Sequence, residues 1–229
     1  MSCPWYEQGN LREEILVFGR AIQGVAPYDI IIEPDHAKCH GGCCSFDDRL
    51  IVVNPTLFDT PPEEQFTLTK GLLVHEAGHK RFTTPSSRPV ITRKIANIME
   101  DERVERLMCE EFIGVRWMVQ RLAERFYQKA TPINPNSDES YLVVSYFLML
   151  RWAKRIGKPV RGNLSKKNQL LWKQVEPLVY DAWQAENSLV VDQYAIVIAE
   201  ILGFNELINI NRVGGRINYN PPTPKTGGE

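Results

Sequence analysis

The spacing of hydrophobic residues changes within the first third of the chain. Between Leu11 and Ile22, apolar residues recur every three to four positions, which predicts a helix that ends at Gly24. Two short runs rich in β-branched residues follow, at 28–32 and 50–53, and each is followed within two residues by a proline. Such runs are typical of buried strands, and we expect the two to share one sheet.

Two long helices are predicted after the strands. Residues 60–63, Thr-Pro-Pro-Glu, have the pattern of a helix start, in which the threonine caps the first amides. This helix should run from about Pro61 to Phe82. After a polar stretch, apolar residues lie on many sides of a second helix, which predicts that it is buried. These residues are Ile91, Ile95, Ile98, Val104, Leu107 and Met108.

The second half of the chain predicts helices only. Segment 131–138 is polar and contains two prolines, so it is the best candidate boundary between two parts. The helices expected after it run from Ser137 to Ile156, over about 164–185, and over 189–202 with Gly203 as the stop.

These patterns together predict an α+β fold. Residues 1–130 should form a core, and residues 131–212 a helical region that packs on it. Residues 213–229 contain few apolar side chains and should form a flexible tail. The 229 residues suffice to bury one large core or two small ones.

Charge and composition exclude several classes of partner. With 27 Lys and Arg against 28 Asp and Glu, the net charge is -1, so no basic field would attract nucleic acid or an anionic membrane. No apolar run is long enough to span a bilayer, and the first residues lack a signal-peptide pattern. Three of the five cysteines crowd into 39–44, unlike the spaced cysteines of a disulfide scaffold. We therefore expect a cytoplasmic protein without a membrane or nucleic-acid partner.

The first predicted long helix contains the motif His75-Glu76-Ala77-Gly78-His79, an H-E-x-x-H. Residues four apart share one face of a helix, so the two imidazoles can bind one Zn²⁺ with Glu76 beside the open coordination position. The alternative is a helix with two ordinary histidines. Against it, a glycine at position 78 costs about 1 kcal/mol relative to alanine, which is better explained if something approaches the backbone closely. The motif therefore predicts a zinc site.

The residues around this motif resemble a known family. The segment Gly71-Leu-Leu-Val-His-Glu-Ala-Gly-His-Lys-Arg-Phe-Thr, followed by Asn97-x-x-Glu-Asp-x-Arg-Val-Glu, resembles zincin metallopeptidases of the gluzincin or aspzincin kind. More narrowly, it is similar to the metallopeptidase region found beside von Willebrand A domains in cobaltochelatase-like and phage proteins. The resemblance covers about residues 45–110, and the chain has no Asp-x-Ser-x-Ser motif of a von Willebrand A domain. It implies a zincin-like core within 1–130, with a small sheet, the H-E-x-x-H helix and a following ligand helix.

The second long helix offers two candidates for a third ligand, Glu100 and Asp101. In zincins, the third ligand is commonly followed four residues later by a residue that hydrogen-bonds a ligating histidine. Asp101 has Glu105 at that spacing, whereas Glu100 has a valine. We therefore prefer Asp101 as the ligand, with Glu105 as the residue that hydrogen-bonds a ligating histidine. Glu100 stays the alternative ligand. The expected metal ligands are His75, His79 and Asp101.

The other charges near these helices have simpler explanations. On the ligand helix, we expect a solvated face or local ion pairs for Glu102, Arg103 and Arg106. A basic run later in the chain is most simply a solvated helix end favoured by the helix dipole, with a local basic patch as the alternative. It comprises Arg151, Lys154, Arg155, Lys158 and Arg161.

The predicted site indicates zinc-dependent hydrolysis of peptide bonds. Zn²⁺ lowers the pKa of its bound water toward about 7 and polarises the scissile carbonyl, while Glu76 activates that water and passes its proton to the leaving amine. Strand 50–53 resembles the zincin edge strand, which pairs with an extended peptide or protein substrate. The alternative is a zinc-binding, non-proteolytic regulatory or protein-interaction module. The family's association with multi-subunit assemblies implies a protein partner for it.

A second group of chemistry-bearing residues lies between the two predicted strands. Its members are His36, Cys39, His40, Cys43 and Cys44. They could bind a second metal or form a redox-active thiol pair, and the Gly-Gly pair at 41–42 allows a tight chain path. All of them come from one nine-residue segment, without the two separated ligand pairs of common zinc sites. Three interpretations stay open: a second metal site, a thiol pair, or a loop without special chemistry.

Overall fold

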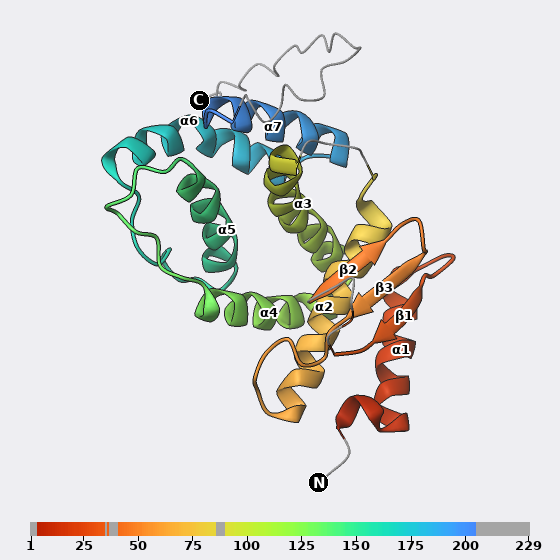
Figure 1. The fold of residues 1–229 in the computed structure, drawn as a ribbon. Helices are drawn as coiled ribbons and strands as arrows, with labels where there is room; N and C mark the ends of the chain where they lie inside the picture. Colours follow the sequence, from red (N-terminus) through yellow and green to blue (C-terminus); the bar gives the residue numbers. More distant parts are fainter. Residues whose placement is uncertain (1–3, 35, 37–40, 86–89, 205–229) are drawn as a thin grey trace.

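A computed structural model describes residues 4–34, 36, 41–85 and 90–204 (Figure 1). In these residues the protein is mostly helical with one three-stranded sheet, which confirms the predicted α+β class. The elements in chain order are η1 (Trp5–Glu7), α1 (Gly9–Gln23), β1 (Asp29–Ile32), β2 (Gly42–Ser45), β3 (Leu50–Val53), α2 (Pro62–Phe82), α3 (Val90–Glu111), η2 (Ile113–Val115), α4 (Arg116–Lys129), α5 (Tyr141–Arg155), α6 (Lys166–Trp183) and α7 (Ser188–Ile201).

The sheet has the strand order β1-β3-β2. As predicted, the two β-branched runs pair, in parallel, with Asp29 opposite Leu50. Strand β2 pairs antiparallel with β3 and lies in the Cys- and His-rich segment between the two predicted strands. The expectation that 50–53 is an edge strand is therefore wrong. Strand β3, with four apolar residues, lies at the centre of the sheet, where Ile51 and Val53 are fully buried. The short Gly-Cys-Cys-Ser strand β2 lies at the edge.

Helix α2 spans the range predicted for it to within one residue, but its predicted cap is wrong, and so is the predicted start of α5. Helix α2 begins at Pro62 with Pro61 as its N-cap, and the amides of residues 64 and 65 bond to the Pro61 carbonyl, so Thr60 does not cap it. Helix α5 begins at Tyr141 rather than Ser137. The side-chain amide of Asn168 on α6 donates to the carbonyls of Ser137 and residue 139, which holds this turn outside the helix.

The buried apolar residues form two clusters that meet on α3. One cluster joins η1, α1, the sheet, α2 and α4, and it includes Met108 and Cys109 of α3. The other joins α3 to α5, α6 and α7, and it includes Ile95 and Met99. Figure 1 shows α3 between the sheet end of the molecule and the C-terminal helices. The division at residue 131 stays a prediction, and the predicted tail 213–229 lies outside the described residues.

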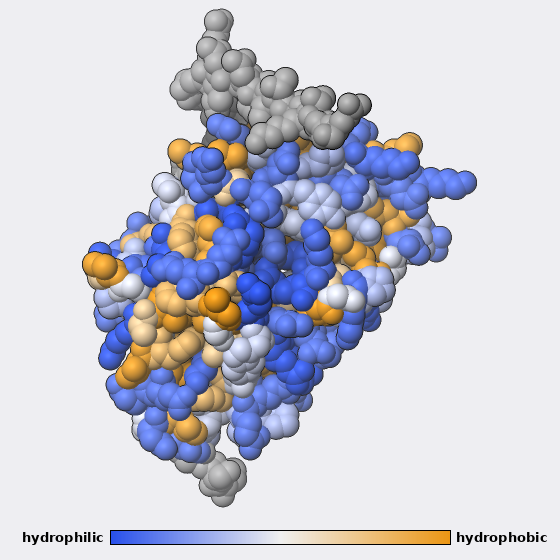
Figure 2. All heavy atoms as spheres, turned by 180° about the vertical axis from the view of Figure 1, so that it is seen from behind, coloured by the Kyte–Doolittle hydropathy of each residue, from blue (hydrophilic) through white to orange (hydrophobic). Residues whose placement is uncertain are grey.

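The surface seen from behind is hydrophilic over most of its area, with apolar residues gathered on its lower left half (Figure 2). The large apolar side chains that are most exposed come from several elements and connections: Val17, Val25, Ile113, Trp117, Leu170 and Leu189. None of the helices in the described part of the chain is both long enough and apolar enough to cross a bilayer.

The glycine inside the histidine motif lets α3 pack closely on α2. A Cβ atom at Gly78 would lie 3.1 Å from Cγ of Met108 and 3.2 Å from Cβ of Val104, closer than most Cβ contacts. The close approach that the sequence predicted at this glycine is therefore made by the helix that carries the candidate third ligand.

Replacing this glycine should weaken the contact between the two helices. We expect Gly78→Ala to lower the free energy of unfolding by about 1 kcal/mol. Overpacking costs about 1–3 kcal/mol, and the higher helix propensity of alanine offsets about 1 kcal/mol of this cost. Urea denaturation measures the change. Gly114→Ala is the matched control, since no atom lies within 4 Å of its added Cβ. A Gly78→Ala protein as stable as this control would contradict the close approach.

Candidate metal centre

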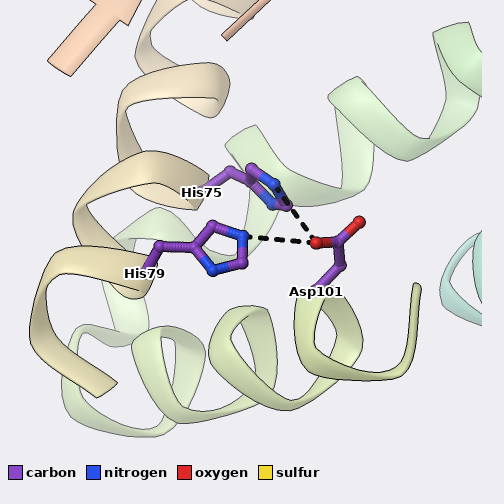
Figure 3. A group of neighbouring side chains, drawn as sticks. All are labelled: His75, His79 and Asp101. Atoms are coloured by element: carbon purple, nitrogen blue, oxygen red, sulfur yellow. Dashed lines mark ion pairs between the residues drawn. The ribbon is translucent and has the colours of Figure 1, made fainter. Parts of the chain in front are cut away.

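Helices α2 and α3 bring two imidazoles and one carboxylate together. The Nε2 atom of His79 lies 3.2 Å from Oδ1 of Asp101, and Nε2 of His75 lies 3.7 Å from the same oxygen (Figure 3). One ligand atom from each of the three residues lies within 4.8 Å of the other two. The spacing of four residues places both histidines on one face of α2, and the α2–α3 contact brings Asp101 opposite them.

The Nδ1 atom of each imidazole makes a hydrogen bond that orients the ring. His75 Nδ1 lies 2.9 Å from Oε1 of Glu105, and a carboxylate oxygen can only accept, so this nitrogen carries the proton. His79 Nδ1 lies 3.0 Å from the hydroxyl of Thr83, which donates its own proton to Glu100. The hydroxyl therefore accepts from His79. In both rings Nε2 is therefore the nitrogen that faces Asp101, and it is the atom that would bind a metal once its proton is lost.

Glu100, the alternative third ligand, is not part of this group. It is 3% exposed and forms an ion pair with Arg103, in which Nη2 of the arginine lies 2.6 Å from Oε1. The hydroxyls of Thr83 and Ser188 donate to the same oxygen. The structure thus places Asp101, not Glu100, with the two imidazoles. Arg103 is 1% exposed, so a solvated position for it is wrong and the local ion pair is confirmed.

Two arginines of α5 lie behind the carboxylates of α3. Nη1 of Arg151 donates to Oδ2 of Asp101 at 3.0 Å, and its Nη2 donates to Oε1 of Glu105 at 2.5 Å. Arg155 donates to Glu102 at 2.5 Å and lies 3.2 Å from Oε2 of Glu105. A solvated helix end is therefore wrong for these two arginines. Arg151 continues a buried stripe of α5, and a signal for this was present in the apolar residues that flank it in the sequence.

Burial and these charges move the pKa values of the site. Burial alone would lower the pKa of His75, but the charge of Asp101 and the bond to Glu105 raise it to about 9. Burial acts to raise the pKa values of Asp101 and Glu105, but the charges and hydrogen bonds around them, of which the charge of Arg151 is the largest, together lower both. For Glu76, burial dominates and raises the pKa despite the nearby histidines. Among these carboxyl groups, Glu76 is the one whose surroundings favour proton uptake.

Glu76 lies directly under the edge strand β2. It is 4% exposed, and a Cβ atom added to Gly42 would lie 2.5 Å from its Oε1. With any other residue at position 42, the Glu76 side chain would have to shift. The sequence analysis missed this role of Gly42 and also the role of Thr83 behind His79.

The cysteine and histidine segment is described only in part. Cys43 and Cys44 lie on β2, His36 precedes it, and Cys39 and His40 lie outside the described residues. No disulfide joins the described cysteines to one another. Within the described ranges, His75, His79 and Asp101 form the only group of three or more such side chains that could hold a metal. Burial, and secondly the charge of Glu76, raises the pKa of Cys44 to about 12.

Comparisons with protein-family models, with curated proteins and with solved structures find no match for this chain. The resemblance to zincins therefore stays a prediction from the motif residues.

The raised pKa of Cys44 predicts a slow reaction with iodoacetamide. The thiolate is the reactive form, so at pH 8 we expect labelling more than about a hundredfold slower than that of an ordinary cysteine. Mass spectrometry of peptides from the labelled protein measures the rate. The same chain unfolded in guanidinium is the control, in which Cys44 should react normally. Fast labelling of the folded protein would favour the reactive thiol pair.

The choice between the two adjacent carboxylates predicts different outcomes for two isosteric variants. We expect Asp101→Asn to lose zinc, because it removes a ligand charge. Glu100→Gln should keep zinc but lower the free energy of unfolding by about 3 kcal/mol, because Arg103 stays buried without its partner charge. Elemental analysis and urea denaturation measure the two effects. Loss of zinc from Glu100→Gln alone would reverse the assignment.

Proposed function

We propose that this protein is a zinc-dependent metallopeptidase that hydrolyses peptide bonds. The observation that carries the proposal is the convergence of His75 Nε2, His79 Nε2 and Asp101 Oδ1 on one point, with Glu76 buried on the same helix. Three protein ligands of this kind leave a coordination position for substrate or water, as in catalytic zinc sites.

The donor set fits Zn²⁺. Imidazole nitrogen and carboxylate oxygen are ligands that zinc accepts, and both Nε2 atoms are the ones available to it because the Nδ1 atoms bond to Glu105 and Thr83. When bound, the ion supplies a Lewis acid that polarises a carbonyl group and acidifies water. The residues of the chain hold the ligands in place and move the proton.

Glu76 is the group that would accept and return the proton. Its burial favours the protonated form more than in an exposed glutamate, which suits a carboxylate that takes a proton and then gives it to a leaving amine. The other carboxylates near the histidines are bound to arginines, so they are less suited to proton uptake. This division of roles among the carboxyl groups supports the proposal.

The edge strand β2 is the best candidate for binding an extended peptide. Among the described strands it pairs only with β3, so its outer edge can accept a further strand through backbone hydrogen bonds. It also passes directly against Glu76 at Gly42. A peptide or protein substrate bound there would lie near the carboxylate, and the corrected edge strand takes the role that the sequence analysis gave to 50–53.

One observation favours the second candidate function, a zinc-binding module without peptidase activity. Glu76 is 4% exposed beneath β2, so the carboxylate is covered in this conformation. A module of this kind would bind a protein partner within a larger assembly and keep zinc for structure. Peptide hydrolysis separates the two functions, because both of them bind zinc.

The proposed role of Glu76 predicts the behaviour of Glu76→Gln. This variant should keep about one zinc per chain and lose turnover by about a hundredfold or more, because a general base contributes that much to the rate. Activity is measured by mass spectrometry on a mixture of peptides, with and without a zinc chelator. Glu63→Gln, an exposed position in the first turn of the same helix, is the control and should stay active.

Two results would contradict the proposal. Unchanged turnover in Glu76→Gln would remove Glu76 from the mechanism. A wild-type protein that binds zinc but cleaves none of the peptides would favour the module.

A further inference from the structure

A single buried arginine of the C-terminal region contacts both the candidate ligand Asp101 and Glu105, which bonds the candidate ligand His75. Arg151 is 5% exposed on α5, on the face that also carries the fully buried Phe147. Its guanidinium spans Oδ2 of Asp101 and Oε1 of Glu105 with two different nitrogens. A charge in this position is costly unless it is paired, and these carboxylates pair it.

Each of the two contacts fixes an atom that matters for the metal. The bond to Oδ2 leaves Oδ1 of Asp101 as the oxygen that faces both Nε2 atoms. The bond to Glu105 is made through Oε1, the oxygen that also lies 2.9 Å from Nδ1 of His75. One guanidinium therefore orients the third ligand directly and orients His75 through Glu105.

We propose that Arg151 is a positioning residue of the metal centre, through which helix α5 sets zinc affinity and coordination geometry. The inference rests on the proposed zinc site but not on peptidase activity. A planar guanidinium can bond two carboxylates at fixed angles, whereas a lysine ammonium is a point charge on a flexible stem. Geometry and charge thus make opposite predictions for some substitutions.

If Arg151 acted only through its positive charge, its removal would change zinc affinity in the opposite direction. A positive group behind the ligands repels a cation, so removing it should tighten zinc binding if Arg151 acted only as a charge. If it positions the ligands, replacing it should weaken binding even when the charge is kept. Loss of a residue that orients metal ligands typically costs about 10–100-fold in metal affinity.

The experiment measures zinc affinity by competition with a chromophoric chelator, and the visible absorption spectrum of the Co²⁺-loaded protein. Arg151→Lys keeps the charge and should bind zinc about tenfold or more weakly, with a changed Co²⁺ spectrum. Arg161→Lys is the matched control, because Arg161 donates to backbone carbonyls of residues 127, 128 and 130. Its affinity and spectrum should equal those of the wild type.

A second variant guards against loss of folding. The double variant Arg151→Gln with Glu102→Gln removes one charge of each sign, so the buried cluster keeps its net charge and Arg155 stays to pair Glu105. Circular dichroism of the metal-free proteins identifies the variants that fold. If Arg151→Lys does not fold, the double variant decides, with the same weaker affinity expected.

The results separate this inference from the proposed function. A wild-type protein that binds no zinc contradicts the proposed function. A folded Arg151 variant with wild-type zinc affinity and an unchanged Co²⁺ spectrum overturns the positioning role alone.

Discussion

The charges buried on α3 need partners inside the protein, and the rest of the structure depends on this requirement. A carboxylate removed from water costs several kcal/mol unless it is paired and hydrogen-bonded. Glu100 and Glu105 are each 3% exposed, and their partners include Arg103 of the same helix and Arg151 of α5. The contacts that compensate these charges also fix how the C-terminal helices pack on α3.

The same compensation orients the two imidazoles. His75 is connected through Glu105 to α5, and His79 is connected through Thr83 and Glu100 to Ser188 at the start of α7. Each ring is thus held by hydrogen bonds that end on a different helix of the C-terminal region. The helical region is a structural part of the candidate metal centre, although its sequence gives no sign of metal chemistry.

The two candidate functions differ in what happens at the edge strand. Gly42 brings the backbone of β2 against Glu76, so the strand controls access to that carboxylate. In a peptidase, this edge would both bind the extended peptide and allow water to reach Glu76. In a binding module, the same contact would keep the carboxylate covered. The sheet edge, rather than the ligand set, therefore distinguishes an active site from a structural one.

The sequence by itself determined the features that depend on local periodicity. The helix around His75 and His79, the β-branched strands and the four-residue spacing between Asp101 and Glu105 all follow from spacings within one helix or strand. The backbone geometry of a helix or strand sets these spacings, so they can be read along the chain.

Only the tertiary structure decided the rest. The Gly-Cys-Cys-Ser segment carries no strand pattern, and it becomes strand β2 because β3 offers it a partner. The apolar residues that flank Arg151 indicate burial, but its role arises from carboxylates about fifty residues earlier in the chain. The adjacent residues Glu100 and Asp101 receive different roles because they point to different neighbours. Such contacts join residues that are distant in sequence, and the packing of the whole chain determines which of them meet.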